Sequence, residues 1–147
     1  MHPSIEIRVA TTEDSGQISL LVREPGYATS PQQSYQKLTD IRDSKTDRVL
    51  VTVPDEELLG CISLHAIPLF HAEGNLGRIT ALVVSEQQRG QGIGHALILQ
   101  SRQWFEAAHC MRSEVTSDDK RERAHRFYER HGYARQGQRL LQKSWLE

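Results

Sequence analysis

The chain has no long apolar segment and no surplus of charge. No run approaches the roughly 18 apolar residues that a membrane-spanning helix needs, and the first residues lack the basic start and apolar stretch of a secretion signal. The 18 basic and 19 acidic side chains nearly cancel, and neither sign gathers in one half of the chain. We therefore expect a cytoplasmic protein that binds neither membrane nor nucleic acid.

Cysteine is also scarce. Cys61 and Cys110 stand apart in apolar surroundings and lack the CxxC spacing of a redox or zinc site, so we expect buried structural thiols and no metal centre. The chain has no internal repeat and no low-complexity stretch. Its 147 residues, 37% of them hydrophobic, are enough to bury a core without disulfides. We expect one domain that spans residues 1–147.

Hydrophobic periodicity predicts alternating strands and helices. Strands are expected at 5–9, 48–53, 58–66, 78–84 and 112–117, with two more between 133 and 145. Helices are expected at 11–24, 31–41, 93–108 and 121–131, the last one ended by Gly132. Residues 68–77, which contain Pro, Asn and Gly, are expected to form a loop. The predicted fold class is α/β, with a mixed central sheet of about seven strands flanked by about four helices.

A glycine-rich turn joins the most apolar strand to the longest helix. Residues 84–94 read Val-Ser-Glu-Gln-Gln-Arg-Gly-Gln-Gly-Ile-Gly. The first N–H groups of a helix have no helical acceptor, the helix dipole adds positive charge there, and glycine lets a phosphate approach the backbone. No GKS or GKT follows, as a P-loop requires, and the spacing is not the GxGxxG of a Rossmann fold. The turn is therefore a candidate pyrophosphate site of another kind.

Two motifs connect this turn to a known family. The run Arg89-x-x-Gly92-x-Gly94 resembles the acetyl-CoA signature Q/R-x-x-G-x-G/A of the GNAT superfamily of N-acetyltransferases. Residues 124–133 are similar to the family's A-x-x-F/L-Y-x-x-x-G-F/Y segment. The expected order of elements also matches, so the resemblance covers nearly the whole chain. Within the superfamily the chain is most similar to the aminoalkylphosphonate and small-amine N-acetyltransferases, through Ser63-Leu64-His65 and Lys120-Arg121 among other residues.

The resemblance implies a fold of the GNAT type, acetyl-CoA as co-substrate, a small-molecule amine as acceptor and a homodimer. It implies that the backbone of Leu82, Val83 and Val84 pairs with the pantetheine arm. It also implies a pyrophosphate held by the amides of the turn, which are those of Arg89, Gly90, Gln91, Gly92, Ile93 and Gly94. Tyr128 would protonate the departing thiolate, because a phenol keeps its proton at neutral pH. The alternative for Tyr128 is an aromatic residue that packs in the core.

The base that deprotonates the amine is left open by the sequence. Many relatives carry Glu or Asp on the strand before the signature, whereas residues 78–82 here include no acid. Glu114 on the next strand is the first candidate, with a structural ion pair to Arg112 or a neighbouring arginine as the equal alternative. His65, His71 and Glu73 are further candidates, and for the histidines a surface or hydrogen-bonded core position is the more ordinary interpretation.

Two other functions remain compatible with the same motifs. A protein or peptide N-acetyltransferase would use the same cofactor but needs an open groove for its substrate. A catalytically silent acyl-CoA-binding module would keep the glycines and dispense with acid and base. The presence of Tyr128 favours an enzyme over the silent module.

Overall fold

The structure is a computed structural model that describes residues 5–24, 26, 28–53, 57–86, 92–115 and 122–136. Contacts divide the chain into a unit of residues 1–116 and a unit of residues 117–147. The predicted α/β class is confirmed, because strands and helices alternate around a mixed sheet. Within the described residues the helices long enough for several turns number four, as expected.

The larger unit holds the sheet. Its elements are, in order, β1 (Ile7–Val9), the 3₁₀-helix η1 (Thr12–Asp14), α1 (Ser15–Arg23), α2 (Pro31–Ile41), β2 (Asp47–Thr52), β3 (Gly60–Pro68), β4 (Asn75–Val84), α3 (Ile93–Ala107) and β5 (Cys110–Val115). The strands lie side by side in chain order. Strands β1 to β4 pair antiparallel, and β5 adds parallel to β4 after the crossover through α3.

The smaller unit contains α4 (Glu122–Arg130). Its C-terminus confirms the predicted stop, because Gly132 has a φ of 92° and the Tyr133 N–H donates to the Tyr128 carbonyl over 3.1 Å. This is the Schellman arrangement, in which a left-handed glycine turns the chain off the helix axis. The backbone of Tyr133 therefore completes the helix end.

The expected number of about seven strands is wrong for the part of the chain that the structure describes, which has five. The two additional strands were expected between 133 and 145. Residues 133–136 adopt no regular structure, and the first of them, Tyr133, hydrogen-bonds to the end of α4. Residues 137–147 lie outside the described residues.

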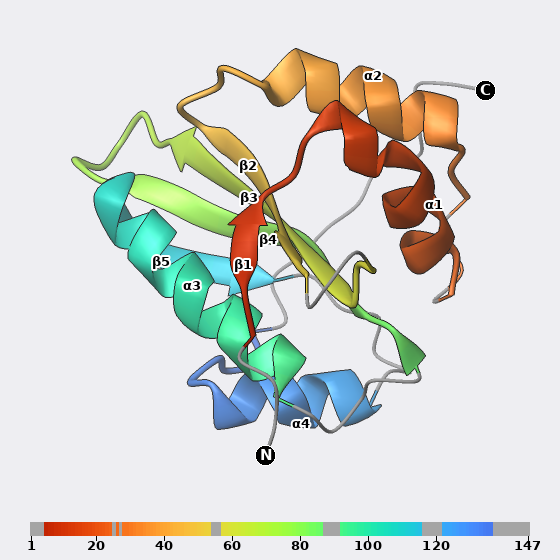
Figure 1. Cartoon of the computed structure of the whole chain (residues 1–147). Coiled ribbons are helices and arrows are strands. Elements are labelled where there is room, and N and C mark those ends of the chain that lie inside the picture. The colour runs from red at the N-terminus through yellow and green to blue at the C-terminus, as the bar shows by residue number, and fades with distance from the viewer. Residues whose placement is uncertain are drawn as a thin grey trace. The chain divides into compact units, whose positions relative to one another are not determined.

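Helices cover both faces of the sheet (Figure 1). Helix α3 lies on one face, where a Cβ at Gly60 would stand 2.9 Å from Ile93 and a Cβ at Gly77 would stand 2.6 Å from Phe105. Helices α1 and α2 cover the other face, and their buried side chains share a core with those of three adjacent strands. That core comprises Ile18, Leu21, Leu38, Val51, Leu58, Cys61 and Val83.

The two cysteines differ in burial. Cys61 is in the core between the sheet and the α1–α2 layer, and complete burial raises the pKa of its thiol to about 12. This confirms Cys61 as a structural thiol. Cys110 begins β5 and is only partly buried, so the expectation of a buried thiol is wrong for this residue, although its partial burial still raises the pKa of the thiol.

Strand β4 begins three residues earlier than the sequence predicts. Residues 75–77 were expected to end a loop, because Asn and Gly usually mark turns. Instead Asn75 pairs with Cys110 on β5, and its side-chain amide donates to the Ala108 carbonyl at the end of α3 over 2.9 Å. Gly77 leaves room for the Phe105 ring, so both residues serve the packing of α3 on the sheet.

A β-bulge interrupts β4 at Thr80. Ser63 on β3 pairs with Ala81, whereas the next residue, Leu64, pairs with Ile79, so Thr80 has no partner of its own. An extra residue reverses the alternation of side chains along a strand. Gly77 faces α3 before the bulge, and Val83 faces the α1–α2 core after it.

Candidate active site

Strand β4 has a neighbour on its β5 side along only half of its length. The parallel pairing of β4 with β5 ends at Ile79 and Val115, while β4 continues to Val84. On its other edge, Ala81 to Val84 pair with β3 as far as Gly60. Among the residues that the structure describes, no strand lies on the β5 side of Thr80–Val84. Such an edge offers backbone N–H and C=O groups to an extended ligand, and the Leu82–Val84 segment implied by the resemblance lies on it.

The N-terminus of α3 lies near Val84, the C-terminal end of β4. Gly60, which pairs with Val84, comes so close to Ile93 that an added Cβ would stand 2.9 Å from that side chain. Helix α3 starts directly after Gly92, so its first N–H groups, which have no acceptor within the helix, are at the Val84 end of the strand. The helix dipole adds partial positive charge there, which suits an anion.

Gly92 has the geometry that a phosphate cradle needs. Its φ of 81° and ψ of 9° are left-handed, and among the described residues beyond its chain neighbours no heavy atom lies within 4 Å of the position that a Cβ would occupy. The backbone is therefore bare and open at this point. Of the other predicted pyrophosphate ligands, Ile93 is buried and Gly94 is half-buried in the first turn of α3. Arg89, Gly90 and Gln91 lie outside the described residues.

A row of four ionisable side chains crosses the sheet close to the bulge. Asp47 on β2 stands opposite His65 on β3, His65 stands opposite Arg78 on β4, and Arg78 stands opposite Glu114 on β5. Since directly paired residues project to the same face of a sheet, the four side chains share one face. Leu64 and Ile79, the paired neighbours of His65 and Arg78, are fully buried.

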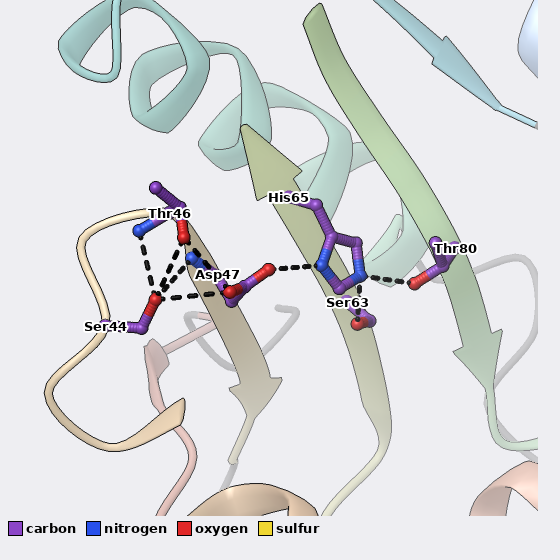
Figure 2. A network of polar contacts seen from close by, with 6 residues as sticks. All are labelled: Ser44, Thr46, Asp47, Ser63, His65 and Thr80. Atoms are coloured by element: carbon purple, nitrogen blue, oxygen red, sulfur yellow. Dashed lines mark hydrogen bonds and ion pairs between the residues drawn. The ribbon is translucent and has the colours of Figure 1, made fainter. Parts of the chain in front are cut away.

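Figure 2 shows the hydrogen bonds at one end of this row. The His65 Nδ1 atom is 2.6 Å from the Asp47 Oδ1 atom, and its Nε2 atom is 2.7 Å from the Thr80 hydroxyl and 3.2 Å from the Ser63 hydroxyl. Asp47 Oδ2 accepts hydrogen bonds from the hydroxyls of Ser44 and Thr46. The sequence singled out His65 but gave no sign of these partners, because they depend on strand register and on the bulge.

The charge state of Asp47 fixes the tautomer of His65. Burial raises the pKa of the Asp47 carboxyl, but hydrogen bonds from His65, Thr46 and Ser44 outweigh that effect and leave the pKa below its ordinary value. Asp47 is thus ionised at neutral pH and can only accept. We assign the Nδ1 proton of His65 to this bond, which leaves Nε2 as the acceptor for the two hydroxyl groups.

Glu114, the predicted base candidate, lies at the other end of the row. The Arg78 Nε atom donates to the Glu114 Oε1 atom over 2.7 Å, and the adjacent Nη2 atom contacts the same oxygen. Both side chains are partly exposed. The structural ion pair that the sequence left open for Glu114 is thus made with Arg78, which pairs with Glu114 in register across β4 and β5.

The remaining predicted residues lie elsewhere. His71 and Glu73 are exposed in the turn between β3 and β4, beyond the strand ends. Tyr128 is on α4 in the smaller unit, where its ring contacts those of Phe127 and Tyr133, with centroids 5.4 and 5.9 Å apart. The described part of the larger unit also has an open hollow of about 420 Å³ between α2, β2 and the segment after β1. Asp47 lines that hollow as well as holding His65.

Comparison with known proteins agrees with this arrangement. The family model of the acetyltransferase (GNAT) family matches residues 17–133, which include β4, the turn before α3, and α4. The chain therefore belongs to the GNAT acetyltransferase family and is an N-acetyltransferase. The predicted family and the GNAT type of the fold are confirmed.

Two kinds of relative illustrate the match. The aminoalkylphosphonate N-acetyltransferase of Salmonella typhimurium is 33% identical over an alignment of 136 residues, and the match covers 89% of this chain and 86% of that protein. This agrees with the branch suspected from the sequence. A transcriptional regulator from Bacillus halodurans has a TM-score of 0.86 at 23% identity and covers 96% of this chain and 100% of its own. Glucosamine-6-phosphate N-acetyltransferase from Arabidopsis thaliana has a TM-score of 0.82 at 15% identity, with 99% and 100% coverage. At these identities the two structures show the fold alone.

The helices also bear on the relation to membranes. Within residues 5–24, 28–53, 57–86, 92–115 and 122–136, no helix has the length and apolar character needed to cross a bilayer.

Proposed function

We propose that the protein transfers the acetyl group of acetyl-CoA to the primary amine of a small molecule. The proposal rests on two features of the fold that lie next to each other. The edge of β4 that lacks a strand neighbour and the open N-terminus of α3 meet at Val84. One ligand that has both an extended, amide-containing arm and an anionic group can bind there. Acetyl-CoA has these two parts, its pantetheine and its pyrophosphate, in the required order.

The backbone supplies most of the binding groups in this proposal. Leu82, Val83 and Val84 hydrogen-bond the pantetheine amides, and the amides of residues 89–94 hold the pyrophosphate. Ile93 and Gly94 are the described members of this second set at the helix start. Because the contacts are made by backbone atoms, the site tolerates many side chains but requires the left-handed Gly92.

The reaction proceeds by direct attack. The neutral amine adds to the thioester carbonyl, the tetrahedral oxyanion collapses, and the carbon–sulfur bond breaks. We propose that Tyr128 donates the proton that the leaving thiolate takes up. The support is its position in the family's second motif, together with a phenol that is protonated at neutral pH.

The acceptor amine must lose a proton before it attacks, and Glu114 is one candidate base. Its carboxylate contacts Arg78 in the row that crosses the sheet. A catalytic role for Glu114 requires that the amine reach this carboxylate in place of the guanidinium. The substitution Glu114→Gln tests the role, since it keeps the size of the side chain and removes the charge.

The name of the curated relative supports a proposal for the acceptor class. That protein is named for aminoalkylphosphonates, in which an amine stands near an anionic phosphonate. We propose a small amine of this kind, and further propose that the enzyme works as a homodimer in the cytoplasm. Static light scattering with and without acetyl-CoA tests the dimer, and fractionation of cells tests the location.

The decisive experiment measures transfer and binding together. Purified protein is incubated with acetyl-CoA and, in separate reactions, a 1-aminoalkylphosphonate, the matching amino acid, an aliphatic diamine and a peptide with free N-terminal and lysine amines. Thiol release and the mass of the acetylated product report transfer, and calorimetry reports the affinity for acetyl-CoA. We expect tight acetyl-CoA binding and transfer to a small amine.

The alternatives give different results. Preferred transfer to the peptide would make the protein a protein or peptide N-acetyltransferase. Tight binding without transfer to any amine would identify an acyl-CoA-binding module. No binding of acetyl-CoA at all would refute the assignment of β4 and α3 as the cofactor site.

A further inference from the structure

His65 is held on both sides by groups that define its chemistry. Its Nδ1 atom is 2.6 Å from the Asp47 carboxylate, and its Nε2 atom is 2.7 Å from the Thr80 hydroxyl. The imidazole is 30% exposed, and Thr80 is exposed. A neutral imidazole whose Nδ1 proton is bound to a carboxylate has a basic Nε2 atom, and the carboxylate stabilises the cation that forms when Nε2 gains a proton.

Thr80 places this pair beside the reacting end of the cofactor. The residue follows Ile79, the last β4 residue that pairs with β5, and so begins the edge assigned to pantetheine. The N-terminus of α3 is at the opposite, Val84 end of that edge. With the pyrophosphate at α3 and the arm along Leu82–Val84, the thioester points toward Thr80. This step rests on the proposed function.

We propose that His65 is the base of the acetyl transfer, that Thr80 relays the proton to it, and that Asp47 holds the ring and balances its charge. Many relatives carry an acid on the strand that corresponds to β4. Here Ala81, which follows the bulge and faces the same side of the sheet as His65, has no carboxylate. In this proposal the network takes the place of that acid.

The proton transfers balance. The acceptor ammonium gives one proton to the Thr80 oxygen as the Thr80 hydroxyl gives its own proton to His65 Nε2. The neutral amine then forms the carbon–nitrogen bond, and the carbon–sulfur bond breaks with its electron pair on sulfur. The thiolate takes a proton from Tyr128, and the second proton that the nitrogen loses as the amide forms restores the phenol. After product leaves, the imidazolium returns its proton to solvent through the same hydroxyl. Asp47 stays ionised throughout, so the pair is neutral overall when His65 is charged.

Charged side chains surround His65 on the sheet and beside it. Asp47 on β2 favours the imidazolium, whereas Arg78 on β4, directly opposite in register, disfavours it. Glu114 on β5 neutralises Arg78. Arg42, at the end of α2, lines the hollow that Asp47 also lines. The arrangement thus has one carboxylate in contact with His65 and a second that offsets its cationic neighbour.

The test is the pH dependence of kcat/KM with the best amine from the transfer assay. In the wild type we expect kcat/KM to rise through the range in which imidazole titrates, about pH 5 to 8, and then to level off. In His65→Gln only amine that is already neutral reacts. The rate should then be about 10²-fold lower near pH 7, climb with unit slope, and approach the wild-type value near the pKa of the amine, about 9 to 10.

Matched variants separate the relay from the base. Thr80→Ser keeps the hydroxyl and should stay within a few-fold of wild type, whereas Thr80→Val has nearly the same shape and should behave like His65→Gln. Asp47→Asn can donate a hydrogen bond to Nδ1, so it should turn the ring to the wrong tautomer and also remove the plateau. His71→Gln, in the exposed turn, is the control and should keep the wild-type profile. Acetyl-CoA affinity should be unchanged in all of them.

The outcomes distinguish the two levels of the proposal. If the wild type acetylates an amine but His65→Gln keeps the plateau, the base is wrong while the proposed function stands. Loss of the plateau in Glu114→Gln alone assigns the base to Glu114, and loss in His71→Gln overturns the assignment as well. Wild-type behaviour of Thr80→Val refutes the relay. Failure of the wild type to acetylate any amine overturns the proposed function and the base with it.

Discussion

Substitutions of Gly92 should affect the stability of the protein and its affinity for acetyl-CoA to different degrees. The φ of 81° penalises any residue with a Cβ, but no atom of the described residues beyond the chain neighbours lies within 4 Å of that Cβ position, so the substitution strains the backbone without a clash against them. Gly92→Ala should therefore lower the free energy of unfolding by about 1–2 kcal/mol, which corresponds to a fall in Tm of roughly 2–8 °C. Gly92→Asn should cost less, because asparagine tolerates the left-handed region.

Binding should respond differently from stability. If the pyrophosphate lies against the bare backbone here, any Cβ displaces it and weakens at least one hydrogen bond to a charged oxygen, each worth about 1.5–3 kcal/mol. We expect the Kd for acetyl-CoA to increase roughly ten- to one-hundred-fold in both variants, including the nearly unstrained Gly92→Asn. Thermal unfolding and isothermal calorimetry measure the two effects on the same samples.

A second glycine provides the control for strain. Gly26 also has a positive φ, 104°, and no atom in the described part of the chain beyond its neighbours lies within 4 Å of a Cβ; it lies in the connection between α1 and α2. Gly26→Ala should lower stability without changing the affinity for acetyl-CoA. Wild-type affinity in a folded Gly92→Asn protein would show that the ligand does not approach this backbone, and the reasoning about the cradle would be refuted.

Three further substitutions test the packing and the chemistry. Asp14 accepts two hydrogen bonds from Arg8, and despite burial these lower the pKa of its carboxyl. Because the folded pKa is below the unfolded value of about 3.9, Asp14→Asn should lower the free energy of unfolding by about 1–3 kcal/mol at pH 7. Urea titrations should show this loss of stability vanishing as the pH falls through the folded pKa. A constant cost down to pH 2 would contradict the ion-pair explanation. Gly77→Ala drives a Cβ to 2.6 Å from the Phe105 ring and should cost about 1–3 kcal/mol, less in a Phe105→Leu background, and equal costs in both backgrounds would rule out the contact. Tyr128→Phe should lower turnover by about 10²-fold and leave acetyl-CoA affinity within a few-fold, whereas turnover at the wild-type level would return Tyr128 to core packing.

The sequence predicted the elements of the fold far better than the contacts between them. Periodicity located the β3 and β4 strands and the long helix α3, because burial of one face or both leaves a regular pattern. It misplaced the start of β4, since Asn75 and Gly77 were interpreted as turn residues when they serve the contact with α3. A glycine chosen for close packing cannot be told from a turn glycine without knowing its neighbour.

The candidate site was only partly predictable for a similar reason. The glycine-rich turn is a local signal that the sequence shows directly, whereas the left-handed backbone of Gly92 was found only in the structure. The contact between His65 and Asp47 joins residues 18 apart in the chain, and it exists because of the register between β2 and β3. The bond from His65 to Thr80 depends in addition on the bulge, which no pattern in the sequence revealed. Long-range register is set by the packing of the whole sheet.

The bulge at Thr80 also constrains how this protein can change. It shifts the phase of β4, so that Ile79 and Val83 face opposite sides of the sheet although four residues separate them. Deleting one residue here would restore a regular strand, turn Val83 out of the core under α1 and α2, and carry the hydroxyl away from His65. Substitutions along β4 can accumulate one at a time, but a change in its length between Ile79 and Ala81 alters the core and the surroundings of His65 in a single event. The strand therefore admits new side chains readily and new lengths hardly at all, and any transplant of this site into another sheet must include the extra residue.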